Sequence, residues 1–167
     1  LDPDNFSFGE QSFYQFAVLS DGYSHAVSAS QINSFIASVP KGANGMLAGQ
    51  GQTFIDAAKQ YGVNEVYLLA HAILESGWGT SELANGYRYS GGTIDGTYYP
   101  AGTYYNFYGI GAYDDTPLSG GRKLAIINGW NSPEKAITGA ARWIAKYYIN
   151  DQPNPQNTLY KMKWDIQ

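Results

Sequence analysis

The sequence has no cysteine, and this absence excludes disulfide bonds, thiol catalysis and metal sites built from thiolates. It has only two histidines, His25 and His71, so we expect no zinc site. No apolar run reaches the length of a membrane-spanning helix, and the chain begins at Leu1 without a signal peptide, as a piece of a longer protein would. The net charge of −4 gives no electrostatic basis for binding nucleic acid or an anionic membrane. We therefore expect neither of these partners, no metal and no cofactor.

Aromatic residues are what the sequence has in abundance. They make up 16% of its 167 residues, and 15 of them are tyrosines. A chain of this length is most simply one domain, with enough residues for a hydrophobic core. Aromatic rings in such numbers suit stacking on sugar rings or a tyrosine-rich interface.

The stretch 64–83, NEVYLLAHAILESGWGTSEL, is expected to organise the fold. Asn64 is a good helix N-cap, and the negative charge of Glu65 suits the first turn of a helix. The residues from 66 to 74 are so densely apolar that we expect a helix buried on all sides. Glu75 and the turn-forming residues 76–79 would end it.

Glu75 would then lie on the last turn of a buried helix. Burial and the negative end of the helix dipole both raise the pKa of a carboxyl group, and a carboxyl that holds its proton near neutral pH can act as a general acid. The alternative is a helix-end glutamate that reaches water or a backbone N–H. His71, four residues earlier on the same face, is expected to be a packed, hydrogen-bonded histidine rather than a catalytic one.

The remaining pattern predicts a mainly α domain (α+β) with one small β lobe. Residues 1–27 are interpreted as an extended, aromatic lead-in that packs on the main domain, 28–167. Apolar spacing predicts helices over 28–39, 52–61, 122–128 and 132–148, and a glycine-rich turn segment over 40–51. Turn dipeptides between tyrosines and threonines predict a β-hairpin lobe over about 85–105.

Two motifs point to a known family. AHAILESGWGTSELA at 70–84 and YNFYGIGAYDDTP at 105–117 resemble the peptidoglycan β-N-acetylglucosaminidases of glycoside hydrolase family 73, above all the catalytic domains of bacterial autolysins. Residues 46–52, 130–148 and 156–164 match further parts of the family pattern. The resemblance implies a lysozyme-like α fold whose β-hairpin lobe flanks the substrate cleft. It also implies hydrolysis of the β-1,4 bond between N-acetylglucosamine and N-acetylmuramic acid.

The resemblance also assigns site residues. The catalytic glutamate of the family falls on Glu75, in agreement with the electrostatic argument, and a family tyrosine falls on Tyr147 or Tyr148, of which we prefer Tyr148. The ring of Trp78 is equally suited to line the bottom of the substrate cleft and to fill the hydrophobic core. Contacts to the glycan are expected from Trp78, Tyr105, Asn106, Phe107, Tyr108, Tyr113 and Tyr147.

The second catalytic group is left open. Most glycosidases use two carboxylates, and Asp95 is the only carboxylate between 85 and 105. Asp95 precedes a glycine at a hairpin tip, so a turn role is favoured over base catalysis. Asp114 and Asp115 are alternatives, within a sequence that also suits an ordinary turn. We prefer substrate assistance, in which the N-acetyl carbonyl of the sugar attacks the anomeric carbon and Tyr148 orients that group or the attacking water.

Two other functions compete with this one. A muramidase or lytic transglycosylase would act on the same polymer with a single helix-end glutamate, and a non-catalytic glycan-binding wall module would keep the aromatic residues without needing Glu75. The expected partner is a peptidoglycan glycan strand, and the expected location is extracellular, at the bacterial cell wall. The domain is expected to be a monomer. Because an acidic domain is not drawn to anionic wall polymers by net charge, we expect separate wall-binding modules elsewhere in a longer protein.

Overall fold

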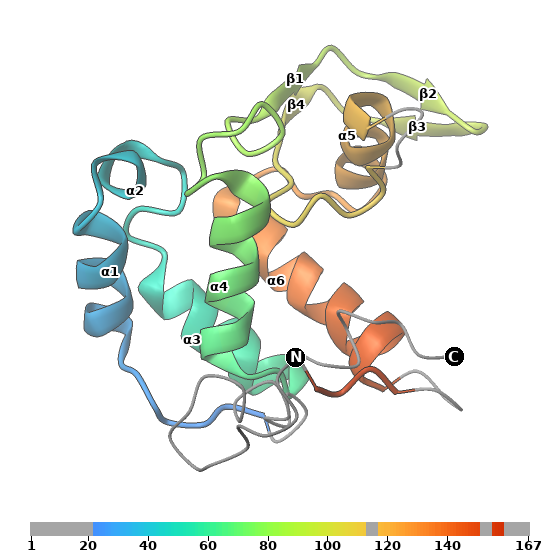
Figure 1. The fold of residues 1–167 in the computed structure, drawn as a ribbon. Coiled ribbons are helices and arrows are strands. Elements are labelled where there is room, and N and C mark those ends of the chain that lie inside the picture. Colours follow the sequence, from blue (N-terminus) through green and yellow to red (C-terminus); the bar gives the residue numbers. More distant parts are fainter. Residues whose placement is uncertain (1–21, 113–116, 151–154, 159–167) are drawn as a thin grey trace, which may run out of the picture.

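The fold is a cluster of helices with a β lobe at one end, and a computed structural model describes it for residues 22–112, 117–150 and 155–158 (Figure 1). Residues 1–21 of the predicted lead-in over 1–27, and the candidates Tyr113, Asp114 and Asp115, lie outside these ranges. The helices are α1 (Ala29–Ala37), α2 (Pro40–Asn44), α3 (Gly51–Tyr61), α4 (Glu65–Ser76), α5 (Pro117–Ile127) and α6 (Pro133–Ile144), followed by the π-helix η2 (Ala145–Ile149). The strands are β1 (Tyr87–Tyr89), β2 (Gly92–Ile94), β3 (Thr97–Tyr99) and β4 (Gly102–Tyr104). The expected mainly α architecture with a small β lobe is confirmed.

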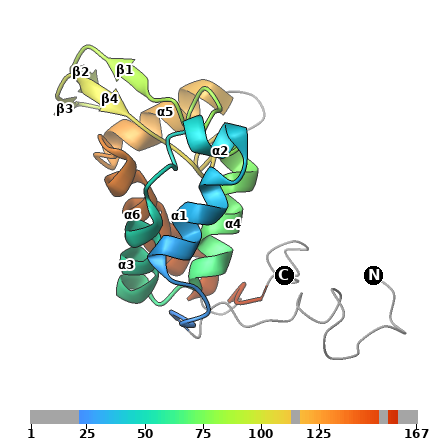
Figure 2. The same ribbon diagram turned by 90° about the vertical axis from the view of Figure 1, so that its left-hand side faces the viewer.

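The core lies among α1, α3, α4 and α6. Of these, α3 is the central packing element, because it contacts each of the other three (Figures 1 and 2). Its inward face contributes Phe54, Ile55 and Ala58, all buried. The facing side of α6 is lined with small and branched residues such as Ala140 and Ile144, which let the two helices pack closely. Within the described ranges, no helix is both long and apolar enough to cross a membrane.

The expected helix starts are confirmed by their caps. The side-chain oxygen of Asn64 accepts a hydrogen bond from the Tyr67 N–H at 3.0 Å, and the Ser132 hydroxyl accepts one from the Lys135 N–H at 3.3 Å. Ser28 forms a reciprocal capping box with Gln31 at the start of α1. Each cap satisfies a backbone N–H that has no partner within the helix, so the sequence determines where these helices begin.

Helix α4 is not buried on all sides, and this expectation is wrong. Leu68 and Leu69 are buried, but Val66, Ala70 and Leu74 are exposed, Leu74 at 77%. The exposed residues are four apart and form one stripe along the helix. Since α3 and the core cover only the opposite side, the apolar composition of this helix overstates its burial.

The first turn of α4 holds an unexpected buried carboxylate. Glu65 has 0% of its surface exposed, and it accepts hydrogen bonds from the Ser24 N–H (2.8 Å), the Ser24 hydroxyl (2.7 Å) and the Ala26 N–H (3.0 Å). Burial alone raises the pKa of a carboxyl group, but these bonds stabilise the anion, so the pKa of Glu65 lies below its ordinary value. Glu65 thereby fastens the segment 22–27 to the start of α4.

The β lobe is one long hairpin with an interruption. Strands β1 and β4 pair antiparallel with Tyr87 opposite Tyr104, and β2 pairs with β3 beyond them. At the tip, Asp95 and Gly96 have φ values of 49° and 82°, as a two-residue hairpin turn requires. Figure 2 shows the lobe beside α5 at one end of the molecule. The predicted hairpin is confirmed.

Three elements differ from the sequence-based expectation. The segment expected as a turn at 40–51 contains the short helix α2, which begins with Pro40 at a position where a missing N–H costs nothing. Helix α5 begins at Pro117 rather than at 122. The last part of the expected helix over 132–148 is a π-helix, in which the Asn150 N–H bonds to the Ala145 carbonyl.

Candidate active site

The chain turns sharply after α4, and this turn positions Glu75. Gly77, Trp78 and Gly79 all have positive φ, at 56°, 67° and 80°. A positive φ is rare for a tryptophan, so the surrounding contacts must hold it there. Ser76 supplies part of that support, because its hydroxyl bonds to the Ala72 carbonyl and accepts the Gly79 N–H at 2.8 Å.

Backbone from the 46–52 motif packs directly against this turn. The Met46 N–H donates to the Gly79 carbonyl at 3.0 Å. A Cβ atom at Gly79 would lie 2.8 Å from the Leu47 nitrogen, a distance too short for any side chain. Gly79 is therefore required both for its backbone conformation and for this approach. These contacts between the 46–52 motif and the turn at 77–79 fix the position of the end of α4.

Trp78 packs on the side of α1 and α2. Its ring lies 5.6 Å from the Phe35 ring between centroids, and a Cβ at Gly42 would lie 3.0 Å from it. These contacts give Trp78 a packing role in the fold. A contact between Trp78 and a glycan stays a prediction.

Glu75 is exposed, and the expectation that it would be buried is wrong. The reason is its position on the last turn of α4: His71, one turn earlier on the same face, packs against Tyr67 and Tyr108, but this packing does not extend to Glu75. Within the described part of the chain, Glu75 forms no hydrogen bond and no ion pair. Every other described carboxylate has a partner: Asp56 with Gln52, Glu65 with Ser24, Glu82 with Arg122, Asp95 with Lys123, and Glu134 with Gln50.

The loop over 106–110 runs beside this carboxylate. A Cβ at Gly109 would lie 3.5 Å from Glu75 Oε2, and Gly109 has a φ of 61°. Asn106 holds the loop in shape, because its Nδ2 donates to the Ile110 carbonyl at 2.8 Å and its Oδ1 accepts the Tyr108 N–H at 3.2 Å. Because residue 109 is a glycine, it places no side chain against the carboxylate.

The side chains of Asn106, Phe107 and Tyr108 are all buried. In this structure they therefore shape the loop, and the loop presents its backbone near Glu75. Tyr105 is half-buried, with its ring stacked 6.3 Å from that of Phe107. Direct contacts of these four side chains with a glycan stay predictions.

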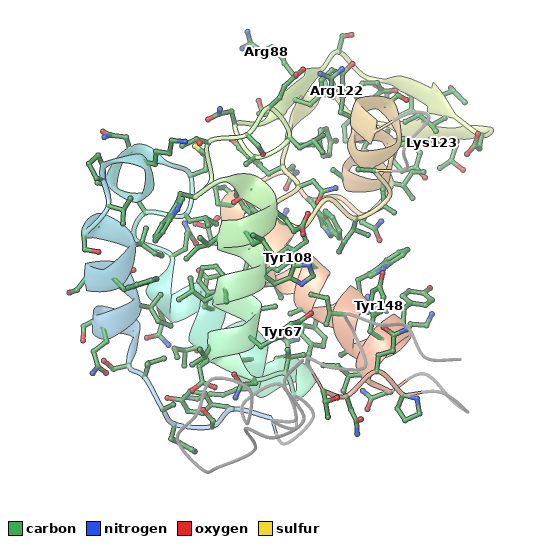
Figure 3. The ribbon with its side chains drawn as sticks, viewed as in Figure 1. Tyr67, Arg88, Tyr108, Arg122, Lys123 and Tyr148 are labelled. Carbon is green, nitrogen blue, oxygen red and sulfur yellow. The ribbon has the colours of Figure 1, made fainter. Side chains whose placement is uncertain are left out.

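A cluster of tyrosines connects Glu75 to the end of α6. Burial raises the pKa of Tyr67 above its ordinary value, and the nearby Tyr148 and Glu75 raise it further. Figure 3 shows Tyr67 and Tyr108 beside α4 on the side that faces α6, with Tyr148 beyond them at the end of α6. Glu75 and Tyr148, predicted separately from distant motifs, thus both act electrostatically on Tyr67.

His71 completes this cluster. Its Nδ1 lies 3.0 Å from the Tyr67 hydroxyl, and its ring meets the Tyr108 ring edge-on at 5.3 Å. Burial lowers the pKa of His71, which favours the neutral imidazole. The Tyr108 hydroxyl donates to the Leu68 carbonyl at 3.1 Å. His71 is therefore the packed, hydrogen-bonded histidine that the sequence predicts.

Two further candidates lie in other surroundings. Tyr147 is exposed, and its ring packs 4.4 Å from that of Trp143. Asp95 is at the hairpin tip, where its Oδ2 forms an ion pair with Lys123 Nζ at 2.7 Å. This pair ties the tip to α5 and supports the turn role of Asp95. A glycan contact for Tyr147 and base catalysis by Asp95 both stay predictions.

Sequence reasoning missed Tyr67 and Gly109. Tyr67 is eight residues before Glu75, so the same helical-face argument that singled out His71 could have found it. Gly109 lies inside the 106–110 motif, but its closeness to Glu75 depends on how the loop folds. Among the described residues, no cluster of three histidine, aspartate or glutamate side chains is arranged to hold a metal ion.

The sequence of this chain matches a family model and the sequences of known proteins. Residues 51–165 match a family model described as mannosyl-glycoprotein endo-β-N-acetylglucosaminidase. The chain is 43% identical, over 98% of its length, to the β-N-acetylglucosaminidase of Bacillus subtilis (strain 168). It spans only 17% of the length of that relative.

Solved structures agree as well. The crystal structure of a major bifunctional autolysin is 41% identical with a TM-score of 0.66, covering 91% of this chain and 55% of that one. A catalytic mutant of S. aureus autolysin E, in complex with the disaccharide NAG-NAM, is 32% identical with a TM-score of 0.65, covering 91% of this chain and 60% of that one. The similarity extends across the fold and includes both motifs.

Proposed function

This chain belongs to the glucosaminidase family, and from that membership we propose that it hydrolyses the β-1,4 bond between N-acetylglucosamine and N-acetylmuramic acid in bacterial peptidoglycan. The observation that carries the proposal is the state of Glu75. Each of the other described carboxylates is bound to a partner, whereas Glu75 is exposed, has no partner among the described residues and lies beside the backbone of Gly109. A carboxyl group in this position can meet a substrate.

Glu75 acts as the general acid. Its proton passes to the glycosidic oxygen as the bond to the anomeric carbon breaks, and the muramic acid residue leaves as an alcohol. Glu75 lies on the last turn of α4, beside the backbone of Gly109.

Bond cleavage is substrate-assisted. As the glycosidic bond breaks, the carbonyl oxygen of the N-acetyl group attacks the anomeric carbon and forms a cyclic oxazolinium. In the second step, water attacks the anomeric carbon and opens this ring, and the water gives a proton to the Glu75 carboxylate. Tyr148 orients the acetamido group or the water, since it shares with Glu75 the neighbourhood of Tyr67. Asp95, paired with Lys123 at a solvated tip, is left in its turn role.

The partner of the site is the glycan strand of the cell wall, where the protein would act outside the cell. The chain corresponds to a fraction of its relatives, so we assign it the catalytic role within a longer protein whose other modules bind the wall. The domain itself acts as a monomer.

The test is to identify the new chain ends. Peptidoglycan is digested with the domain, reduced with borohydride and analysed by mass spectrometry, with Glu75→Gln as the control. Reduced N-acetylglucosamine ends are the expected result. Reduced muramic acid ends would indicate a muramidase and anhydro ends a transglycosylase, and either would contradict the assigned bond. Binding to the wall without new ends would indicate a non-catalytic glycan-binding module.

A further inference from the structure

A groove along α6 is lined by groups to which the proposed reaction assigns no role, apart from Tyr147, whose contact with a glycan is a prediction. It encloses about 430 Å³, and its lining includes Trp130, Arg142, Trp143, Lys146 and Tyr147 but none of the residues around Glu75. We call it the α6 groove.

The charged groups free to bind in the α6 groove are cations. Within the part of the chain that the structure describes, the Arg142 guanidinium has no hydrogen-bond or ion-pair partner. Lys146 is exposed, and its Nζ lies 3.1 Å from the Tyr147 hydroxyl and 4.7 Å from the centre of its ring. Glu134, the carboxylate that lines the groove, is bonded to Gln50 at 3.0 Å. On a protein of net charge −4, this is a local concentration of positive charge.

The lining also contains a buried donor. Trp130 is only 3% exposed, and its indole N–H has no acceptor among the described residues. A Cβ at Gly139 would lie 2.0 Å from Trp130 Nε1, so the absence of a side chain at 139 makes room for the indole. A buried N–H without an acceptor costs free energy, and a ligand oxygen would remove that cost.

Aromatic rings form the rest of the surface. Trp143 and Tyr147 lie 4.4 Å apart between ring centroids and are tilted by 45°. Exposed aromatic faces bind the apolar faces of sugar rings, and guanidinium and ammonium groups bind carboxylates and phosphates. Both features lie within one groove.

We propose that the α6 groove, with its unpaired Arg142 beside Lys146 and the Trp143–Tyr147 pair, is a second binding site, for a saccharide that carries an oxyanion. The oxyanion contacts Arg142 and Lys146, and the sugar lies against the aromatic pair. The choice of a cell-wall saccharide rests on the proposed function. Two wall components carry this chemistry: peptidoglycan with its carboxylates, and wall polymers linked by phosphodiesters.

The test measures binding by a domain that cannot cleave, so that it does not depend on the reaction. Glu75→Gln is combined with Arg142→Glu, or with Lys41→Glu as the charge-matched control. Lys41 is exposed on α2, outside the groove. Binding is measured by co-sedimentation with intact walls, with walls from which phosphodiester polymers have been removed, and with a neutral N-acetylglucosamine polymer. Circular dichroism confirms that each variant is folded.

We expect Arg142→Glu to weaken binding to intact walls about tenfold, the usual size for a charge-assisted contact, and Lys41→Glu to leave it unchanged. Binding by the Glu75→Gln parent should also weaken as salt is added. If the tenfold difference disappears on walls without phosphodiesters, the oxyanion is a phosphate; if it persists, the oxyanion is a carboxylate. Equal binding by the two charge variants on intact walls, or an equal loss on the neutral polymer, would overturn the proposal. The reducing-end analysis tests the reaction separately.

Discussion

The two ends of helix α4 carry two glutamates in opposite states. Glu65, in the first turn, is fully buried and accepts hydrogen bonds from Ser24 and Ala26. Glu75, in the last turn, is exposed and has no hydrogen bond or ion pair among the described residues. The helix dipole favours a carboxylate at the first end and disfavours it at the second. A glutamate side chain therefore stabilises the fold at the first end of α4, and another is available for reaction at the second end.

The comparison shows that satisfied bonds, more than burial, distinguish the two roles. Burial alone would raise the pKa of Glu65, yet its hydrogen bonds keep that pKa below the ordinary value. The hydrogen bonds of Glu65 stabilise its anion and are occupied by the 22–27 segment. Glu75 has no such bonds among the described residues, so its carboxyl group is open to a bound substrate.

The largest effect is expected from Glu75→Gln. Glutamine keeps the shape of the side chain but cannot transfer a proton, so the rate of glycan hydrolysis should fall by about 10²- to 10⁴-fold. Because Glu75 has no partner to lose, the urea midpoint of unfolding should stay within error of the wild type. Steady-state assays on purified glycan strands measure the first quantity, and urea titration the second. A variant that hydrolyses at the wild-type rate would remove Glu75 from the mechanism.

Glu65→Ala should show the reverse pattern. It leaves the Ser24 and Ala26 donors without an acceptor, and the free energy of unfolding should fall by roughly 3 kcal/mol. The rate per folded molecule should change little, since Glu65 lies at the other end of the helix. Unfolding curves and active-site titration separate the two effects. If the free energy of unfolding were unchanged, the hydrogen bonds between Glu65 and the 22–27 segment would not contribute to stability.

Tyr148→Phe tests whether the Tyr148 hydroxyl takes part in the reaction together with Glu75. Loss of the hydroxyl should lower the turnover number about tenfold, the usual value of one hydrogen bond to a reacting group. Since Tyr148 is exposed, stability should be unchanged. Tyr98→Phe, which changes an exposed tyrosine of β3 outside both proposed sites, is the matched control. Equal losses for the two variants would argue against a specific role for Tyr148.

The pH dependence of stability should reveal the contribution of Glu65, at the first end of α4. The pKa of Glu65 is lowered in the folded state, so its contribution is complete above the unfolded pKa and is lost as the pH falls through the folded pKa. The free energy of unfolding should therefore fall on acidification below about pH 4.3, the ordinary glutamate pKa. In Glu65→Gln this fall should be smaller but still present, because Glu134 also has a lowered pKa, held by Gln50. An unchanged slope in Glu65→Gln would contradict the assignment.

The smallest effect is expected from Asp95→Asn, which extends the comparison to a third carboxylate. Asparagine also tolerates positive φ, so the hairpin tip should persist. An exposed ion pair contributes little to stability, so the loss of the pair with Lys123 should leave the fold intact. Activity should therefore change by less than about twofold. A loss as large as that of Glu75→Gln would contradict substrate assistance and make Asp95 the second catalytic group.

Local chemistry in the sequence accounts for much of the fold. Asn64, Ser132 and the Asp95–Gly96 pair each determine their own backbone surroundings, and all three positions agree with the structure. The turn around 77–79 is local only in part: its glycines permit the backbone conformation, and contacts with residues 46 and 47 hold it. Helix starts and turns depend on a few neighbouring residues, which is why they could be predicted.

Long-range contacts account for what the sequence could not show. The partner of Glu65 is 41 positions away, at Ser24, and nothing near Glu65 indicates it. Apolar density predicted burial around Glu75, but which side of α4 meets the core depends on how α3 and α6 pack. The closeness of Gly109 to Glu75 likewise depends on the tertiary fold. Glu75 and Tyr148 could be named from motifs, but their shared neighbour Tyr67 could not.

The most direct test of the central claim compares two leaving groups. An aryl glycoside of the disaccharide N-acetylmuramyl-N-acetylglucosamine, with a dinitrophenol as leaving group, needs no proton donor, whereas a glycan strand does. The rate of first-turnover bond cleavage is measured for wild type and Glu75→Gln on both substrates. If Glu75 donates the proton, the variant should cleave the aryl glycoside at nearly the wild-type rate and the glycan strand far more slowly. An equal loss on both substrates would show that Glu75 is not the proton donor.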